Sequence, residues 1–327
     1  MRRRQFVGAG VSVIALSAIG ARGERGNNTT PKIDAAAFNE SRQFIETQFG
    51  RIAYVERGAG PLSALFLHGF PLSGFQWRGA LERLSPYRRC IAPDFMGLGF
   101  TEVSPGQDLR PATQAQMLGA VLDTLSVETV DLVANDSGSA VAQLFAVRFP
   151  ERVRTMLLTN GDVEFDCPPA ALLPVIELAK AGRYADEWLV PWVRDPGLAR
   201  SPQGLGGLCY SKPGFPSDEG IACYLVPLVS SQERKAMVNA YTVALERNAL
   251  AGIEPALRRC RAPVKVVWGV ADSIFSAESP RYLDRILPRS KGVRRIETAK
   301  LFFPEEYPDI IAEEARALWN VSSRSNQ

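Results

Sequence analysis

Short runs of β-branched, aromatic and other apolar residues recur along the chain from residue 44 onward, and helical patterns separate most of them. Eight such runs occupy residues 44–49, 52–56, 64–67, 89–92, 130–134, 153–159, 264–268 and 293–297. Strands that alternate with helices predict an α/β fold, with a mainly parallel eight-stranded sheet covered by helices on both faces. Only Gly50 and Arg51 separate the first two runs, so we expect an antiparallel hairpin at one edge. An amphipathic helix around residues 308–319 ends the pattern.

The alternation stops between residues 165 and 255, where the pattern becomes helical and rich in aromatic side chains. A helical block inserted after the sixth strand is expected to lie over the carboxyl ends of the strands, where open α/β sheets bind ligands. We therefore expect an α/β core at residues 44–164 and 256–322 and a helical cap at residues 165–255. Trp188, Trp192 and Tyr241 of the cap, together with Trp77 of the core, are candidates for the wall of a substrate pocket.

The first 21 residues have the layout of an export signal. Arg2, Arg3 and Arg4 precede an apolar run at residues 7–19, and small residues follow, as in twin-arginine signals. A membrane anchor is the alternative, but the run is shorter than the roughly 20 residues that span a bilayer. We expect a periplasmic or secreted protein with no stable membrane insertion after cleavage. Residues 22–43 are polar and aperiodic, which predicts a tether.

The charge of the chain bears on its partners. Three of its 38 basic residues are Arg2, Arg3 and Arg4, so cleavage would leave 35 basic residues against 35 acidic ones. A nearly neutral mature chain offers no electrostatic basis for binding nucleic acid. The sequence makes no prediction of the oligomeric state.

Cysteine and histidine usage argues against a metal site. The five cysteines have no C-x-x-C spacing and the chain has one histidine, so we expect no zinc. No G-x-G-x-x-G or P-loop spacing is found where strand meets helix, so we expect no cofactor. Cys209 and Cys223 flank a loop rich in Gly, Pro and Ser and are candidates for a disulfide in an exported protein. Five free, buried thiols are the alternative.

The most informative segment joins the predicted strand 130–134 to the helix that follows it. Small residues at Ala134, Gly138 and Ser139 surround Asp136. This spacing is typical of a nucleophile elbow, a sharp turn that exposes one side chain above the sheet and needs small neighbours. A carboxylate there can attack an electrophilic carbon and form an ester. Two alternatives stay open: Ser137 occupies the turn and acts in ester hydrolysis, or Asp136 only caps the helix.

Two further segments complete the predicted site. The strand 64–67 ends in His68-Gly-Phe-Pro, and the backbone N–H near Phe70 is expected to form an oxyanion hole with that of Ser137. His68 is expected to support this turn through hydrogen bonds rather than to act as a base. Asp272 follows the strand 264–268 at its carboxyl end, where the acid of a catalytic triad would orient an imidazole.

Four motifs together resemble the α/β-hydrolase superfamily: His68-Gly-Phe-Pro, Ala92-Pro-Asp-Phe-Met-Gly-Leu-Gly, Asn135-Asp-Ser-Gly and Trp268-Gly-x-x-Asp. The resemblance covers most of residues 44–320 and is weakest in the cap. Asp136 is similar to the nucleophile of the haloalkane dehalogenase and epoxide hydrolase branch, and Asp272 to the triad acid. The resemblance implies that Asp136 forms an ester with the substrate, which water then hydrolyses with the help of a histidine.

The chain departs from this branch at two places. Dehalogenases commonly have Trp after the nucleophile, and many have Asn after His-Gly, whereas Ser137 and Phe70 occupy those positions here. Trp77 or a Trp of the cap could replace these donors to a halide. The histidine of the branch lies in a pattern such as Gly-His-Phe-x-x-Glu-Glu-x-Pro, and here Leu301 occupies its place. Leucine cannot accept a proton, so hydrolysis of the ester loses a general base worth about 10²- to 10⁴-fold.

Three functions follow from these motifs. The first is a hydrolase that acts on a small apolar haloalkane, epoxide or ester-like molecule, with Asp136 as nucleophile and an impaired hydrolytic step. The second is a non-hydrolytic protein that binds a small ligand, because Asp136 and Asp272 without an imidazole should raise each other's pKa. The third is an esterase with Ser137 as nucleophile.

Overall fold

The computed structural model describes residues 34–321. The predicted export signal at residues 1–21 and most of the predicted tether lie outside the described residues. None of the helices in the described range has both the length and the apolar character needed to span a bilayer.

Eight strands in the described range form one sheet in the order β1-β2-β4-β3-β5-β6-β7-β8. β2 runs antiparallel to its neighbours β1 and β4, and the other neighbouring pairs are parallel. This topology confirms the predicted fold class and the hairpin at one edge. The strands are β1 Arg42–Thr47, β2 Gly50–Arg57, β3 Ser63–Leu67, β4 Arg89–Pro93, β5 Val130–Asp136, β6 Val153–Gly161, β7 Val264–Gly269 and β8 Ser290–Ile296.

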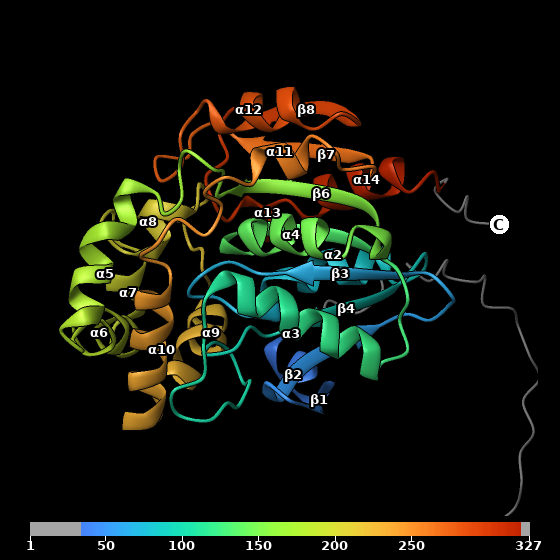
Figure 1. Ribbon diagram of the computed structural model, residues 1–327. Helices are drawn as coiled ribbons and strands as arrows, with labels where there is room; N and C mark the ends of the chain where they lie inside the picture. The colour runs from blue at the N-terminus through green and yellow to red at the C-terminus, as the bar shows by residue number, and fades with distance from the viewer. Residues whose placement is uncertain (1–33, 322–327) are drawn as a thin grey trace, which may run out of the picture. The chain divides into compact units, whose positions relative to one another are not determined.

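Helices cover both faces of this sheet (Figure 1). In this view α3 and α4 pack side by side in front of the strands, and α2 packs on α14 behind them. The α-helices are α1 Ala35–Glu40, α2 Arg78–Leu84, α3 Pro111–Thr124, α4 Ser137–Arg148, α5 Leu173–Lys180, α6 Val190–Arg194, α7 Pro196–Ala199, α8 Leu205–Cys209, α9 Asp218–Val229, α10 Gln232–Ala244, α11 Glu254–Leu257, α12 Ser279–Ile286, α13 Phe303–Glu306 and α14 Pro308–Leu318. Short 3₁₀ or π turns lie at Gly74–Trp77, Pro150–Arg152, Ala170–Leu172 and Ala185–Leu189.

Helices α5 to α10 gather beyond the carboxyl ends of the strands, at the left of Figure 1. They lie in the chain between β6 and β7, within the range for which the sequence predicts a cap. Serine residues start the two longest of them. The Ser217 hydroxyl accepts from the Gly220 N–H in α9, and the Ser231 hydroxyl accepts from the Arg234 N–H in α10, so each satisfies a donor that has no partner inside its helix.

The predicted tether, residues 22–43, is wrong in its last part, because α1 and the start of β1 lie there. The Asp34 carboxylate caps α1 by accepting from the Ala37 N–H at 2.8 Å. Phe38 of α1 is 1% exposed and packs edge-on against the Phe75 ring, with 5.2 Å between ring centroids. Burial of this aromatic side chain helps to hold the short helix on the core.

The predicted disulfide between Cys209 and Cys223 is also wrong, because all five cysteines are free. Cys209 lies at the end of α8 and lines the central cavity of the protein. Cys223 lies in α9, and its thiol donates to Asn39 Oδ1 at 3.7 Å, next to α1. The two thiols therefore face different parts of the molecule, which the length of the loop between them could not reveal.

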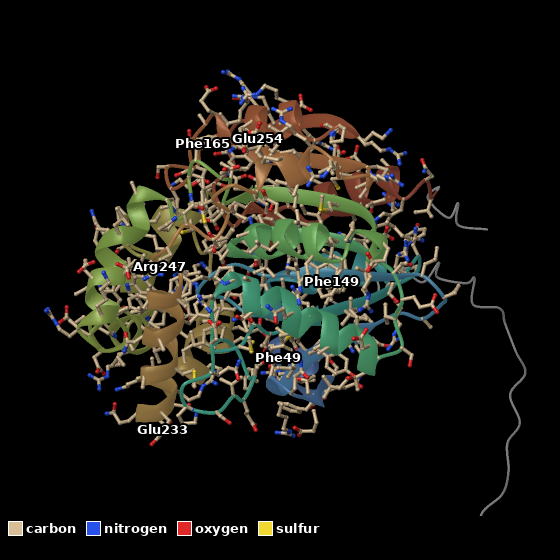
Figure 2. All side chains as sticks on the ribbon, viewed as in Figure 1. Phe49, Phe149, Phe165, Glu233, Arg247 and Glu254 are labelled. Atoms are coloured by element: carbon tan, nitrogen blue, oxygen red, sulfur yellow. The ribbon has the colours of Figure 1, made fainter. Side chains whose placement is uncertain are left out.

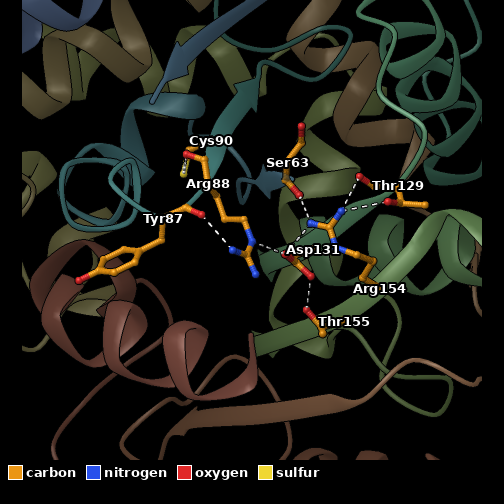
Figure 3. Close-up of polar contacts among 8 residues, drawn as sticks. All are labelled: Ser63, Tyr87, Arg88, Cys90, Thr129, Asp131, Arg154 and Thr155. Carbon is orange, nitrogen blue, oxygen red and sulfur yellow. Dashed lines mark hydrogen bonds and ion pairs between the residues drawn. The ribbon is translucent and has the colours of Figure 1, made fainter. Parts of the chain in front are cut away.

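A buried ion-pair network joins the amino ends of three strands, at the end of the sheet away from the cap (Figure 3). Asp131 of β5 is 1% exposed and accepts from Arg88 Nε at 2.9 Å and from Arg154 Nη2 at 2.6 Å. Its second oxygen accepts from the Thr155 hydroxyl at 2.8 Å. Arg154 also donates to the Ser63 carbonyl at 2.7 Å, so the network links β3, β5 and β6.

We predict that Asp131→Ala lowers the free energy of unfolding by about 3–5 kcal/mol, because it leaves two largely buried guanidinium groups without their carboxylate. Asp123→Ala is the matched control: Asp123 pairs with Arg152 at 2.6 Å, but its side chain is 70% exposed. Removal of such an exposed partner should cost less than about 1 kcal/mol. Urea denaturation of both variants measures the difference, and equal losses would contradict this assignment.

Candidate active site

Asp136 ends β5 and directly precedes α4. Its φ of 55° and ψ of −131° lie in a region that few residues other than glycine adopt, which makes the strand-to-helix turn sharp. Gly138 allows the helix to start so close to the sheet, because a Cβ there would lie 2.5 Å from the Leu67 carbonyl oxygen. Ser137 is the first residue of α4, so the register that puts Ser137 at the turn does not match the backbone.

Two backbone N–H groups hold the Asp136 carboxylate. The Phe70 N–H donates to Oδ2 over 2.6 Å, and the Ser137 N–H also donates to the carboxylate. These are the two groups that the sequence predicts as an oxyanion hole. Gly69 permits the close approach, because a Cβ there would lie 2.7 Å from the Asp136 Cβ. The same pair of donors would stabilise an oxyanion formed from the Asp136 carboxyl group during hydrolysis of an ester.

A pair of buried amides connects the three segments of the site. Asn135 Nδ2 donates to the Leu301 carbonyl at 3.0 Å and to the Thr159 hydroxyl at 2.8 Å. Gln76 Nε2 donates to Asn135 Oδ1 at 2.6 Å, while Gln76 Oε1 accepts from the Gly69 N–H at 2.9 Å. Removal of either side-chain amide would leave buried polar groups without hydrogen-bond partners, and each such group costs about 1–3 kcal/mol. Sequence reasoning missed Gln76, whose role depends on a contact made across 59 residues.

His68 and Lys300 lie next to site segments in the sequence, but neither side chain is hydrogen-bonded to Asp136. His68 is completely buried, and its Nε2 accepts from the Phe95 N–H at 3.0 Å, so Nδ1 carries the proton and donates to the Gly69 carbonyl at 2.8 Å. Burial also lowers the pKa of His68. This confirms the predicted supporting role. Lys300 turns away from the site and donates to the Gly207 carbonyl at 2.5 Å.

Asp272 follows β7 and lies near Asp136, without an imidazole beside it. It accepts from Asn160 Nδ2 and from the Ile274 N–H, both at 2.8 Å. The Ala271 N–H donates to the Ala299 carbonyl at 3.0 Å, which brings the Asp272 turn alongside the segment that leads into Leu301. Asp272 occupies the position of a triad acid that would orient a histidine. Its hydrogen-bond partners are instead the Asn160 side-chain amide and the backbone.

A cavity of about 260 Å³ opens onto Asp136 between the core and the cap, a size suited to a small molecule. Most of its wall is apolar. From the core, Phe70, Ser137 and Leu301 line it, and from the cap Trp188, Trp192 and Leu205. Arg247 borders the cavity just beyond α10, at the end of that helix nearer the sheet (Figure 2).

Two side chains predicted to line the pocket lie behind its wall. Trp77 is fully buried against Phe66, with 5.7 Å between ring centroids, and its indole N–H has no hydrogen-bond partner among the described residues. It cannot donate to a departing halide. The ring of Tyr241 stacks on that of Phe70, with 5.5 Å between ring centroids, and the Tyr241 hydroxyl lies 3.4 Å from Ser137 Oγ. Both predictions were wrong because the sequence does not fix the direction of a side chain in a loop or on a cap helix.

The structure adds a carboxyl group that sequence reasoning missed. Asp162 lies one residue beyond β6, is 7% exposed and lines the cavity with Asp136. The Cys167 thiol, which also lines the cavity, is hydrogen-bonded to the Asp162 carboxyl group. A signal for Asp162 exists in the sequence, because it follows a buried strand at the edge where Asp136 and Asp272 also lie.

Burial dominates the electrostatics of these carboxyl groups. It raises the pKa of Asp136 to about 7, while the N–H groups of Phe70 and Ser137 oppose the shift and the charge of Asp272 adds to it. Burial likewise raises the pKa of Asp272 to about 6, against the hydrogen bond from Asn160. The pKa of Asp162 is raised well above its ordinary value, first by burial and then by the charge of Asp136. Near neutral pH the cavity therefore holds both ionised and protonated carboxyl groups.

Within residues 34–321, no three His, Cys, Asp or Glu side chains are grouped so that they could hold a metal ion. The chemistry that the described side chains themselves offer is nucleophilic attack by a carboxylate and proton transfer between carboxyl groups.

The sheet order, the turn at Asp136 and the cap above it define an α/β-hydrolase. A family model described as alpha/beta hydrolase fold matches residues 65–195. Haloalkane dehalogenase 2 of Mycobacterium tuberculosis is 34% identical in an alignment 292 positions long, which covers 84% of this chain and 92% of that protein. The chain belongs to the α/β-hydrolase family, in the dehalogenase-like branch.

Solved structures share the fold. An alpha/beta hydrolase fold protein from Burkholderia ambifaria matches with a TM-score of 0.72 and 19% identity over 85% of this chain and 97% of that chain. The epoxide hydrolase CorEH matches with a TM-score of 0.68 and 21% identity over 85% of this chain and 99% of that chain. At these identities the likeness concerns the fold alone.

We predict that Asp136→Asn stabilises the protein at pH 8 and not at pH 4. Because the pKa of Asp136 rises from 3.8 to about 7 on folding, the folded chain binds more protons than the unfolded chain between these pH values. The contribution of this group to stability therefore falls as pH rises through that window. Asparagine removes the buried charge, and we expect a gain on the order of 2 kcal/mol at pH 8, less than the full shift because hydrogen bonds to the carboxylate are lost. Urea denaturation at both pH values measures it, and no gain at pH 8 would contradict the burial of an ionised group.

Proposed function

We propose that this protein is a hydrolase whose Asp136 carboxylate attacks a small, mainly apolar electrophile and forms an ester with it. The observation that carries the proposal is the Asp136 carboxylate itself. It lies at a sharp turn, faces an apolar cavity and accepts hydrogen bonds from the N–H groups of Phe70 and Ser137. A side chain used only as a helix cap would not need this backbone conformation. The candidate substrates are haloalkanes, epoxides and ester-like molecules.

The names of similar proteins support the same classes of substrate. Haloalkane dehalogenase and epoxide hydrolase chemistry both begin with the displacement of a leaving group from carbon, a step for which an aspartate at this position is suited. An aspartate differs from serine in that it needs no base before it attacks. The absence of histidine beside it therefore leaves the first step possible.

The second step is where this chain should differ from its relatives. Leu301 lies where the resemblance places the histidine, and it offers neither a proton acceptor nor a donor. Hydrolysis of the Asp136 ester without an imidazole should be slower by about 10²- to 10⁴-fold than with one. We propose that the ester persists long enough to be detected.

A non-hydrolytic binding protein is the second candidate, and the pKa of Asp136 favours it. A carboxyl group with a pKa of about 7 is half protonated at neutral pH, and its protonated fraction is not nucleophilic. An esterase with Ser137 as nucleophile has less support, because the hydroxyl of Ser137 has only the Tyr241 hydroxyl beside it at 3.4 Å and no base. For all three candidates the partner is a small molecule. We further propose export to the periplasm or beyond the cell, on the sequence of residues 1–21 alone.

We predict that wild-type protein incubated with 1-bromo-2-phenylethane gains the mass of one substrate-derived alkyl group, and that Asp136→Asn does not. The adduct should form faster as pH rises through about 7, because only the ionised carboxylate attacks. Intact-protein mass spectrometry measures both, and Ser137→Ala is the matched control, which should still form the adduct. An adduct in Asp136→Asn, or its loss in Ser137→Ala, would contradict the assignment. Tight binding without any adduct would favour the binding protein.

We predict that Leu301→His raises the rate of adduct hydrolysis by at least about tenfold, because it returns a general base to the segment beside Asp272. Leu301→Gln is the matched control: it has a polar side chain of comparable size and no useful basicity. Decay of the isolated adduct, followed by mass spectrometry, separates the two variants. Equal decay rates would show that the position does not control this step.

A further inference from the structure

Asp162 is placed beside Asp136 by the pairing of two strands. Asp136 and Gly161 are partners in the parallel pair β5·β6, and Asp162 is the next residue. Neighbouring strands lie about 4.8 Å apart, so Asp162 extends from the same edge of the sheet as Asp136, one strand away. Gln143 Nε2 of α4 donates to the Asp162 backbone carbonyl at 2.8 Å and fixes this segment against the helix that starts at the turn.

The surroundings of Asp162 keep it available for reaction. It is 7% exposed and lines the cavity, and no described Lys or Arg forms an ion pair with it. The Cys167 thiol is its hydrogen-bonded neighbour, and that thiol also interacts with the backbone N–H groups of Ala249 and Leu250 beyond α10. A buried carboxyl group without a cation favours its protonated form, which can donate a proton.

We propose that Asp162 is a second catalytic residue of this cavity, which gives a proton to the oxygen that leaves when Asp136 attacks and later takes a proton from the hydrolytic water. The proposal rests on the proposed function of Asp136. It defines the substrate more narrowly, as an electrophile whose leaving oxygen stays on the carbon skeleton, and the epoxide is the smallest such group. A halide leaves as an anion and gains nothing from a proton donor.

The proton cycle closes without any other reactant. In the first step a bond forms between Asp136 and an epoxide carbon, the carbon–oxygen bond of the ring breaks, and the Asp162 proton moves to that oxygen to give a hydroxyl. In the second step the Asp162 carboxylate takes a proton from water as the water oxygen adds to the carbonyl carbon of the ester. Collapse of this intermediate breaks the bond between that carbonyl carbon and the alkyl oxygen, and the alkyl oxygen takes the remaining proton of the added hydroxyl. The diol leaves, with Asp136 ionised and Asp162 protonated again.

The cavity wall also holds the hydroxyl groups of Ser137 and Tyr184. The alcohol of Ser137 is a far weaker acid than a carboxyl group, which leaves Tyr184 as the alternative proton donor. Burial raises the pKa of Tyr184 far above neutrality. A tyrosine that gives up its proton there would leave a costly buried phenolate. A carboxyl group gives up its proton far more readily than a phenol, so it suits a cycle in which the same group gives and takes a proton.

The experiment compares two probes that share a carbon skeleton, styrene oxide and 1-bromo-2-phenylethane, in single-turnover mass spectrometry of the full chain. We expect Asp162→Asn to slow adduct formation with the epoxide by about 10²- to 10⁴-fold and with the bromide by less than about tenfold. Asparagine has nearly the same shape as aspartate, and retained reaction with the bromide reports an intact fold and an intact Asp136. Asp162→Glu, which restores a carboxyl group, should recover part of the epoxide rate.

The pH dependence of the wild-type protein provides a second test that needs no variant. The titratable groups facing Asp162 are Asp136, Asp166, Cys167 and Tyr241. Reaction with the bromide needs only ionised Asp136, so its rate should rise with pH and level off. Reaction with the epoxide needs Asp162 protonated as well, so its rate should rise and then fall. The falling limb should disappear in Asp162→Asn.

The outcomes separate this inference from the proposed function. If Asp162→Asn forms both adducts as fast as the wild-type protein does, the role of Asp162 is overturned and Asp136 remains the nucleophile. Parallel pH profiles for the two probes in the wild-type protein would have the same meaning. An epoxide-specific loss in Tyr184→Phe that is absent from Asp162→Asn would assign the proton to the tyrosine and also overturn the role of Asp162. Adducts with neither probe in the wild-type protein would overturn the proposed function and this inference together.

Discussion

The burial of one carboxyl group at the end of β5 is the constraint on which the site depends. Asp136 is held in a strained turn, 8% exposed, and its charge is balanced by two backbone N–H groups rather than by a cation. Hydrogen bonds from backbone amides stabilise the carboxylate but do not offset its loss of hydration, so its pKa rises. The proposed nucleophile is thus a group whose ionisation is costly and whose surroundings are nearly apolar.

The rest of the site follows from keeping that group in place. The amides of Gln76 and Asn135 join the turn after β3, the elbow and the segment before α13, so the core side of the cavity wall is tied to Asp136 by hydrogen bonds. The ion-pair network around Asp131 fixes the opposite end of the same strand. With Leu301 in the cavity wall, the proposed mechanism assigns proton transfer to the carboxyl groups at the edge of the sheet. Among the described residues, Asp162 is the carboxyl group that lines the cavity with Asp136.

The sequence predicts much of this arrangement, because strand periodicity and the small residues around Asp136 are local signals. These local signals predict all eight strands, the turn at Asp136 and the supporting role of His68. The errors concern features that tertiary packing decides. Trp77 is buried in the core, and Cys209 and Cys223 lie in different parts of the molecule. Helix α1 packs on the core through Phe38, whose ring contacts Phe75. Asp162 follows a buried strand, which is a local signal, but its place beside Asp136 depends on which strand becomes the neighbour of β5, and no local pattern encodes that pairing.

In the proposed reaction Asp136 bonds covalently to substrate and is then regenerated by attack of water on its own carboxyl carbon. We would test this reaction first by turnover of styrene oxide in water enriched in heavy oxygen, followed by mass spectrometry of the peptide that contains Asp136. We expect heavy oxygen in the Asp136 side chain, because water adds to the ester carbonyl. Diol that carries heavy oxygen while this peptide stays unlabelled through repeated turnover would mean that water attacks the substrate directly and that Asp136 is not the nucleophile.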